Sequence, residues 1–173
     1  GHFHIDRSDA PVVLIGGGIG ITPMLSMLSW CLNEQPAREV WLFYGVRDGS
    51  ELMMQARLEA LAAAHHNFHL RFCFSRPRAE ESARSAAHHR GRIDVQLLRM
   101  ELALKPYHFY ICGPTSLMES LVPALEDWGV PDAHIHFEAF GPASIKRRRA
   151  ATSPATIPQN GAEDAGIVVT FAQ

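Results

Sequence analysis

Residues 12–23 carry the sequence VVLIGGGIGITP, and the fold is decided here. The four apolar residues at the start predict a strand buried on both faces, and four glycines follow within five positions. Glycine permits positive φ and lets a ligand approach the backbone without a Cβ atom in the way. Thr22 is a favoured N-cap, and Pro23 suits the first position of a helix. The stretch predicts a strand, a tight turn and a helix whose N-terminal N–H groups face the turn, where a pyrophosphate is the natural occupant.

The glycine spacing departs from the usual dinucleotide fingerprint. Gly16, Gly18 and Gly20 form a G-x-G-x-G pattern that also contains Gly17, and Ile21 stands where G-x-G-x-x-G needs its last glycine. Two interpretations of the turn remain open. We favour a pyrophosphate site over a turn whose glycines serve only the close packing of strand on helix.

Composition limits the class of protein. The 173 residues, 47% of them hydrophobic, suit one domain with a tail. A net charge of -2 gives no electrostatic reason to expect nucleic acid or a membrane surface as partner. The chain shows no membrane-spanning run and no signal-peptide pattern, so we expect a cytoplasmic location. Cys31, Cys73 and Cys112 are odd in number and widely spaced, which suits neither disulfides nor a metal site.

Strands alternate with helices along the chain. The pattern predicts strands at 12–15, 39–45, 68–74, 107–113 and 134–140, and helices at 23–35, 51–64, 93–104 and 114–128. This alternation predicts an α/β fold with a doubly wound five-stranded parallel sheet and helices on both faces.

Several boundaries carry their own predictions. Ser50 is expected to cap the helix that starts at residue 51, and Gly129 is expected to end the last helix. Pro123 lies inside that helix, where it predicts a kink or a broken first turn. Residues 78–91 are charged and have no clear period, so we interpret them as a surface loop.

Ligands of such a sheet bind at the carboxyl ends of its strands. Four turns rich in glycine, proline or charge are predicted to meet at that edge: 16–20, 45–47, 75–77 and 112–114.

Six motifs then appear in a familiar order. They are Gly16 to Pro23, FYGVR at 43–47, SRP at 75–77, Gly91-Arg92, CGP at 112–114 and HFEAFG at 136–141. The set resembles the NAD(P)-binding domain of the ferredoxin–NADP reductase superfamily, especially bacterial oxygenase reductases that couple a flavin domain to a plant-type [2Fe–2S] domain. The resemblance covers residues 1 to about 141.

The resemblance implies roles for individual residues. It implies that the Gly16 to Pro23 turn holds the pyrophosphate and that Thr22 also lies near the nicotinamide ribose. Cys112 matches a cysteine that lies against the C4 side of the nicotinamide, and Gly113-Pro114 matches the turn that leaves room for the ring. A buried small hydrophobe is the alternative role for Cys112.

Two further residues are implied to lie near a flavin. Glu138 matches a carboxylate beside the flavin, and Phe140 matches the aromatic residue that shields the isoalloxazine ring. Glu138 alternates with apolar neighbours and can instead be the exposed face of a strand, and Phe140 can be an ordinary core residue. Cys112 and Glu138 are the candidate catalytic residues. The candidate cofactor-binding residues are Gly16, Gly17, Gly18, Gly20, Thr22, Pro23, Gly45, Arg47, Ser75, Arg76, Cys112, Gly113, Pro114 and Phe140.

The resemblance also divides the chain. Residues 1–5 are expected to end a flavin-binding barrel, and 6–141 to form the NAD(P)-binding domain. Residues 142–165 are expected to be a linker, and 166–173 the first strand of a ferredoxin-like domain. The linker carries the basic run at 146–149, which we interpret as a solvated hinge rather than a contact for a partner or nucleic acid.

The implied activity is hydride transfer from NADH or NADPH to FAD or FMN, followed by single electrons to a [2Fe–2S] centre and an acceptor such as an oxygenase. Within these 173 residues neither the family's flavin-binding Arg-x-Tyr-Ser/Thr pattern nor the four cysteines of the cluster occurs. Flavin and cluster are therefore expected from domains of a longer parent protein.

The choice between the two nucleotides rests on few residues. Ser75-Arg76 matches the pair that grips the 2′-phosphate in plant-type reductases, and Arg92 offers a second cation. Asp94, however, stands where those enzymes place a stacking tyrosine, and its carboxylate disfavours a phosphate. We favour NADH.

Two other classes of function are compatible with parts of the sequence. One is a non-enzymatic NAD(P)-binding sensor or docking module that recruits a partner through the basic linker. The other is a flavodoxin-like or response-regulator domain, which is disfavoured because residues 16–23 lack the acidic cluster or hydroxyl-rich phosphate loop of those folds.

Overall fold

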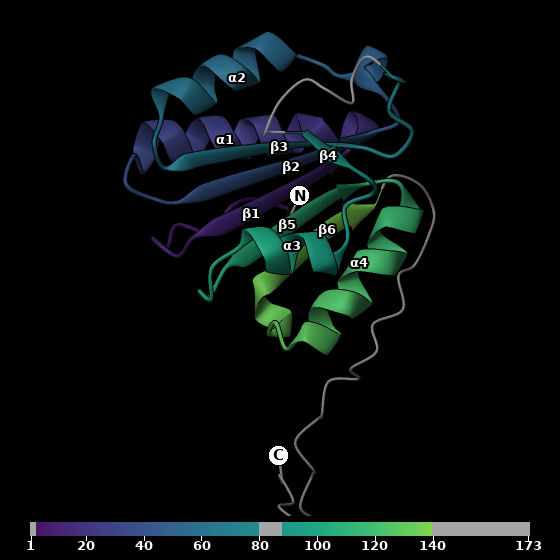
Figure 1. Cartoon of the computed structure of the whole chain (residues 1–173). Helices are drawn as coiled ribbons and strands as arrows, with labels where there is room; N and C mark the ends of the chain where they lie inside the picture. The colour runs from purple at the N-terminus through teal and green to yellow at the C-terminus, as the bar shows by residue number, and fades with distance from the viewer. Residues whose placement is uncertain (1–2, 80–87, 140–173) are drawn as a thin grey trace, which may run out of the picture.

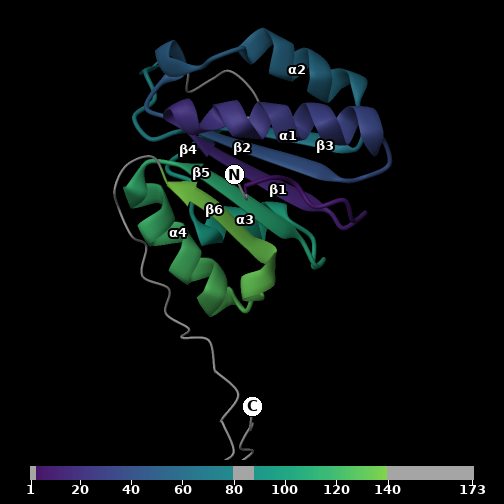
Figure 2. The same cartoon turned by 180° about the vertical axis from the view of Figure 1, so that it is seen from behind.

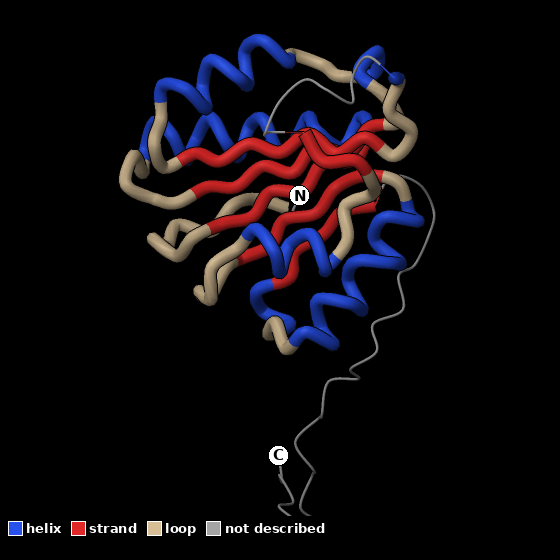
Figure 3. Tube along the Cα trace, viewed as in Figure 1, coloured by secondary structure: helices blue, strands red, loops and turns tan. Residues whose placement is uncertain are grey.

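A computed structural model describes residues 3–79 and 88–139. Within them one six-stranded parallel sheet lies between two layers of helices (Figure 3). The strands are β1 (Val12–Gly17), β2 (Val40–Val46), β3 (Phe68–Phe74), β4 (His88–Arg90), β5 (His108–Gly113) and β6 (Ile135–Ala139). The helices are α1 (Ile21–Glu34), α2 (Gln55–Ala64), α3 (Val95–Glu101) and α4 (Thr115–Trp128), with 3₁₀ turns η1 (Gly18–Gly20), η2 (Gly49–Glu51) and η4 (Asp132–His134).

Helices α1 and α2 cover one face of the sheet, and α3 and α4 cover the other (Figures 1 and 2). The strands supply both cores because alternate side chains point to opposite faces. On β1, Val12 and Leu14 join the core under α1, and Val13 and Ile15 join the core under α4. A strand that feeds two cores needs an unbroken apolar sequence, which explains the first four residues of the fold-deciding stretch.

The predicted parallel sheet is present, but its strand count of five was wrong. β4 falls within the stretch 78–91, which was interpreted as a loop, and it pairs with β3 through the register Phe72↔His88 and Phe74↔Arg90. This strand has three polar residues and no apolar alternation. It lies at the edge of the sheet, where the backbone hydrogen bonds rather than burial of both faces define it.

The start of α1 also differs from the prediction. The helix begins at Ile21, and Gly20 occupies the N-cap. Thr22 therefore lies in the first turn, where its hydroxyl donates a hydrogen bond to the Ile19 carbonyl at 3.0 Å instead of capping the helix. The hydroxyl thus ties the first turn of α1 to η1.

Two other helices start later than predicted. The segment after β2 forms η2, which is capped by Asp48 through a hydrogen bond from the Ser50 N–H at 2.9 Å, so Ser50 is not the cap. Helix α2 then begins at Gln55. Helix α3 begins after Asp94, whose carboxylate accepts from the Leu97 N–H at 2.8 Å and caps it.

Helix α4 ends as predicted. Gly129 adopts φ 95° beyond its last turn, and Val130 donates back to the Leu125 carbonyl at 3.0 Å. The helix runs through Pro123 without a break, and Pro114 is its N-cap rather than its first residue.

Some predictions lie outside the described residues. They concern Phe140, the linker at 142–165, the strand at 166–173 and the first two residues of the barrel segment. Among the helices of the described part, none is long and apolar enough to cross a membrane.

Candidate functional site

The order β4-β3-β2-β1-β5-β6 places β1 between the two halves of the sheet. From β1 the chain winds outward first to β2 and later, from the opposite side, to β5. In a doubly wound sheet this reversal opens a crevice outside the carboxyl ends of the two central strands, and ligands bind there. Here the carboxyl ends of β1 and β5 lie beside the N-terminus of α1, on the right in Figure 1. We call this the carboxyl edge.

The glycines at this edge bring two turns into backbone contact. A Cβ atom on Gly20 would lie 2.1 Å from the carbonyl oxygen of Cys112, which no side chain tolerates. A Cβ atom on Gly17 would lie 2.9 Å from Cδ of Pro114, and one on Gly113 would lie 3.0 Å from Cα of Gly17. The close-packing interpretation is therefore right for part of the glycine turn, although the packing joins it to β5 as well as to α1.

Gly18 is different from its neighbours. It has φ 54°, and no atom lies within 4 Å of the place where its Cβ would be. Packing therefore does not explain this glycine. Its positive φ turns the chain into η1 and leaves open space above the backbone, where a ligand can approach.

The electrostatics of the turn favour an anion. The first turns of η1 and α1 contain no acidic residue, so nothing in them offsets the partial positive charge of the helix N-terminus. Thr22 is exposed and Pro23 partly so in the first turn of α1, and Ile19 is 70% exposed. The open space above Gly18 lies beside the end of the helix that attracts negative charge.

The ends of β2 and β3 are joined at the same edge. Gly45 pairs with Gly17 across β2 and β1. Beyond the strands, Ser75 donates its N–H to the Val46 carbonyl at 3.0 Å, and Arg76 donates to the Arg47 carbonyl at 2.8 Å. These bonds extend the sheet past its last residues and hold the predicted binding turns side by side.

Carboxylates hold two of the arginines at this edge. Arg47 forms an ion pair with Glu51 at 2.6 Å, and Arg78 lies 3.6 Å from Asp48. The sequence motifs did not single out Glu51, Asp48 or Arg78. The four-residue spacing of Arg47 and Glu51 was the available signal for the first of these pairs.

The two candidate catalytic residues lie on neighbouring strands. Cys112 on β5 is opposite Glu138 on β6 in the parallel register. Cys112 is fully buried, whereas Glu138 is exposed. Burial, together with the nearby Glu138 carboxylate, raises the pKa of the Cys112 thiol to about 11. The thiol is therefore neutral at physiological pH and does not act as a nucleophile, and its place in the core under α1 fits the alternative role of a buried small hydrophobe.

Two cavities lie away from the carboxyl ends of β1 and β5. One, of about 390 Å³, separates α1 from α2 and touches the edge only at Thr22 and Met54. The other, of about 270 Å³, lies at the opposite edge between Lys105 and Trp128. Within residues 3–79 and 88–139 no three His, Cys, Asp or Glu side chains are grouped as metal ligands. The candidate site is therefore an open edge built from turns.

The structure brings almost all the predicted site residues to this edge. Those within the described residues are Gly16, Gly17, Gly18, Gly20, Thr22, Pro23, Gly45, Arg47, Ser75, Arg76, Cys112, Gly113, Pro114 and Glu138.

Comparison with known proteins identifies the family. The model of the oxidoreductase NAD-binding domain matches residues 14–122. The chain belongs to this family. The match begins in β1 and ends in α4, so it includes the glycine turn and the end of β5. The resemblance to the NAD(P)-binding domain of the ferredoxin–NADP reductase superfamily, which was drawn from the six sequence motifs, is confirmed.

Similar proteins extend the family assignment. The flavohemoproteins of Halalkalibacterium halodurans and Bordetella pertussis are each 33% identical to this chain, over 80% and 84% of it. The chain spans only 34% and 36% of those proteins. In electron-transfer proteins of this kind it corresponds to the NAD-binding oxidoreductase domain.

Solved structures agree with the fold. The Amycolatopsis cytochrome P450 reductase GcoB has a TM-score of 0.71 and 28% identity, covering 83% of this chain and 43% of that one. The flavohem-like FAD/NAD-binding domain of the nitric oxide dioxygenase from Vibrio cholerae has a TM-score of 0.68 and 28% identity, covering 82% and 56%.

Proposed function

We propose that this chain binds NADH along the carboxyl edge and positions its nicotinamide for hydride transfer to a flavin held by a separate module. One observation carries the proposal. Gly18 has positive φ and open space above it, while Gly17 and Gly20 beside it are packed against β5. The turn therefore combines a rigid base with one open backbone position at a helix N-terminus, which is the arrangement that accepts a pyrophosphate.

Each end of the edge supports one end of the dinucleotide. Cys112 and Gly113 end β5, on the side of the switch point next to β6, so they are proposed to flank the nicotinamide. Ser75 and Arg76 follow β3 on the other side, where they are proposed to contact the adenine ribose. The pyrophosphate between these two ends would cross the glycine turn of β1.

The charge pattern supports NADH over NADPH. A 2′-phosphate needs cations that are free to bind it, and Glu51 and Asp48 already neutralise Arg47 and Arg78. Asp94 caps α3 and adds a further carboxylate to this half of the molecule. Arg76 is exposed.

The flavin part of the proposal rests on the relatives. Flavohemoproteins and an FAD/NAD-binding domain are among the similar proteins. Bound NADH would supply a hydride from C4 of its nicotinamide, and FAD or FMN would accept it. Glu138 is proposed to face the flavin from β6, and Phe140, one residue beyond the described part, to shield its ring. The chain's own contribution is to bind and orient the nucleotide and to exclude water from one face of it.

The proposal also names the acceptors of electrons from the flavin. We infer that electrons pass to a [2Fe–2S] centre in a following ferredoxin-like domain and then to an acceptor such as an oxygenase, in the cytoplasm. The relatives named above are flavohemoproteins and a P450 reductase. The alternative to the [2Fe–2S] centre is therefore a haem group as electron acceptor. Iron and acid-labile sulfide analysis of the full-length protein distinguishes the two.

Calorimetric titration of this chain with NADH and separately with NADPH tests the proposed nucleotide. We expect NADH to bind at least about tenfold more tightly, which corresponds to about 1.4 kcal/mol. Tighter binding of NADPH would make Ser75-Arg76 a phosphate grip. Binding of neither nucleotide would overturn the proposal.

A further inference from the structure

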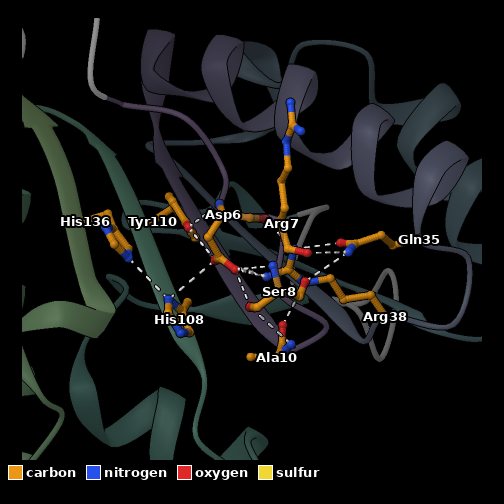
Figure 4. A network of polar contacts seen from close by, with 9 residues as sticks. All are labelled: Asp6, Arg7, Ser8, Ala10, Gln35, Arg38, His108, Tyr110 and His136. Atoms are coloured by element: carbon orange, nitrogen blue, oxygen red, sulfur yellow. Dashed lines mark hydrogen bonds and ion pairs between the residues drawn. The ribbon is translucent and has the colours of Figure 1, made fainter.

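Residues 3–10 lead into β1 and lie against side chains of β5. Ile5 joins the core under α1, and Phe3 lies with its ring centre 6.1 Å from that of Tyr110 on β5. Asp6 contacts Tyr110 and also His108 of the same strand. Figure 4 shows the contacts of Asp6 with Tyr110 and His108. The segment 3–10 is thus fastened to β5, the strand that ends at Cys112.

Arg38 holds this segment from the other side. Its side chain is only 1% exposed, although it carries a charge. Its Nε donates to the Ala10 carbonyl at 2.7 Å and its Nη1 to the Asp6 carbonyl at 3.0 Å. Its Nη2 lies 3.2 Å from Oδ2 of Asp6. Gln35 adds hydrogen bonds to the Ser8 carbonyl and to Arg38. One buried guanidinium therefore binds both ends of the segment 6–10.

Tyr110 completes the arrangement. It is fully buried, and its hydroxyl donates to Oδ2 of Asp6 at 2.8 Å and accepts from the Asp6 N–H at 2.9 Å. Its ring stacks on His136 of β6 at 4.5 Å. Burial raises the pKa of Asp6, but hydrogen bonds from Ser8 and Tyr110 and the charge of Arg38 outweigh it and hold that pKa well below its usual range. The carboxylate stays ionised and keeps all its partners.

These contacts are well placed to control geometry at the site. Tyr110 and Cys112 are two residues apart on β5 and share one face of the sheet, so the fastening point is about 7 Å along the strand from the proposed nicotinamide position. Eight residues that nothing holds can reach up to about 26 Å when fully extended. Hydride transfer requires reacting atoms within about 3.5 Å of one another. A loose tether is incompatible with that requirement.

We propose that Asp6, Arg38 and Tyr110 form a clasp that fixes the path of segment 3–10 across β5 and so sets the position of a flavin-binding module on its N-terminal side relative to the carboxyl edge. The inference rests on the proposed function, because it requires that flavin and nucleotide come from different modules. The three residues are positioning residues. They act through the segment they hold.

The Tyr110→Phe variant tests the clasp, and Tyr107→Phe is its matched control. Tyr107 is also buried, precedes the same strand and donates its hydroxyl to a carboxylate, that of Glu39, at 3.0 Å, but it belongs to the core on the other face. The protein with its flavin module is used, and flavin reduction is followed by stopped flow at saturating NADH. We expect Tyr110→Phe to slow reduction by about tenfold or more. The NADH dissociation constant should change less than twofold, and Tyr107→Phe should leave the rate unchanged.

Asp6→Asn provides a second, milder variant with the same expectation. Amide hydrogen exchange on the 173-residue chain gives a readout apart from activity, because the Asp6 N–H bonded to the Tyr110 hydroxyl should lose protection in Tyr110→Phe only. Unchanged flavin reduction rates in Tyr110→Phe and Asp6→Asn would overturn the clasp, and so would an equal fall in the reduction rate in Tyr107→Phe. In either case, NADH binding by the wild type would still uphold the proposed function. If the wild type binds no NADH, the proposed function fails and the clasp fails with it.

Discussion

Gly20 lies so close to Cys112 that a Cβ atom on the glycine would be 2.1 Å from the cysteine's carbonyl oxygen. The contact joins the turn after β1 to the end of β5, the two central strands at which the strand order reverses. The nucleotide site and the packing of the two central strands therefore depend on the same glycines. Gly17 and Gly20 pack against β5, whereas Gly18 between them faces open space.

Gly20→Ala should be among the most destabilising single-methyl additions at this edge. The added Cβ meets backbone atoms of Cys112 and Gly113 that cannot move without shifting β5, so we expect a loss of about 3 kcal/mol in the free energy of unfolding. Urea denaturation measures it. Gly45→Ala is the control, because its Cβ would come closest to the side-chain atom Cδ1 of Ile93, at 3.1 Å, and would lie 3.9 Å from the nearest backbone atom within 4 Å, the Gly16 carbonyl oxygen. Equal losses in the two variants would contradict this account of the contact.

Thr22→Val should weaken NADH binding while the fold stays intact. The change removes the hydrogen bond from the Thr22 hydroxyl to the Ile19 carbonyl, which ties the first turn of α1 to the glycine turn. We expect a loss of about 1 kcal/mol in binding, roughly fivefold in the dissociation constant. Ser120→Ala removes the corresponding bond to the Leu117 carbonyl in α4 and should not alter binding. Unchanged affinity in Thr22→Val would show that its hydroxyl has no part in the site.

Cys112→Ala should slow flavin reduction more than it weakens NADH binding, when measured by stopped flow in the protein with its flavin module. The proposed role is contact with the nicotinamide as a neutral thiol, since its pKa is raised to about 11. The reduction rate should therefore show no change from Cys112 ionisation between pH 6 and about 9. Identical reduction rates in wild type and variant would make Cys112 a purely structural residue.

Stability should fall as the pH drops below about 6.5, in part because of His108. Burial lowers the pKa of His108; Asp6 opposes this, and His134 and Arg38 add to it, so the net shift is downward. The unfolded chain then takes up a proton at a pH where the folded chain does not, which favours unfolding. Burial also lowers the pKa of His69, so His69 contributes to the loss of stability at low pH in the same way.

Urea denaturation at pH 7.5 and pH 5.5 measures this loss. The difference between the free energies of unfolding at the two pH values should be smaller in His108→Gln than in the wild type. The same is expected of His69→Gln. A difference that stays at the wild-type value in His108→Gln would contradict the assignment.

Most of the sheet was predictable because its strands are buried on both faces. The strand that starts at Val12 and the one that ends at Cys112-Gly113 have apolar runs that no helix period explains, and the turns after them follow from glycine and proline chemistry. Once the sheet is known to be parallel and doubly wound, convergence of those turns at one edge follows from topology.

Features that depend on distant partners could not be predicted. β4 is a strand only because β3 lies beside it. Arg38 lies 32 positions from Asp6, and Tyr110 lies 104 positions from it, so no local spacing announces the clasp. The cap assigned to Thr22 was wrong for a related reason, because η1 extends the turn and begins the helix at Ile21.

The most direct test of the central claim compares Gly18→Ala with Gly129→Ala. Both glycines have positive φ, at 54° and 95°, and open space around the missing Cβ, so both variants should lose about 1 kcal/mol of stability. Only Gly18 lies at the carboxyl edge. Calorimetric titration with NADH should show at least about tenfold weaker binding for Gly18→Ala and wild-type binding for Gly129→Ala. Wild-type affinity in Gly18→Ala would contradict the claim that the pyrophosphate occupies the space above this glycine.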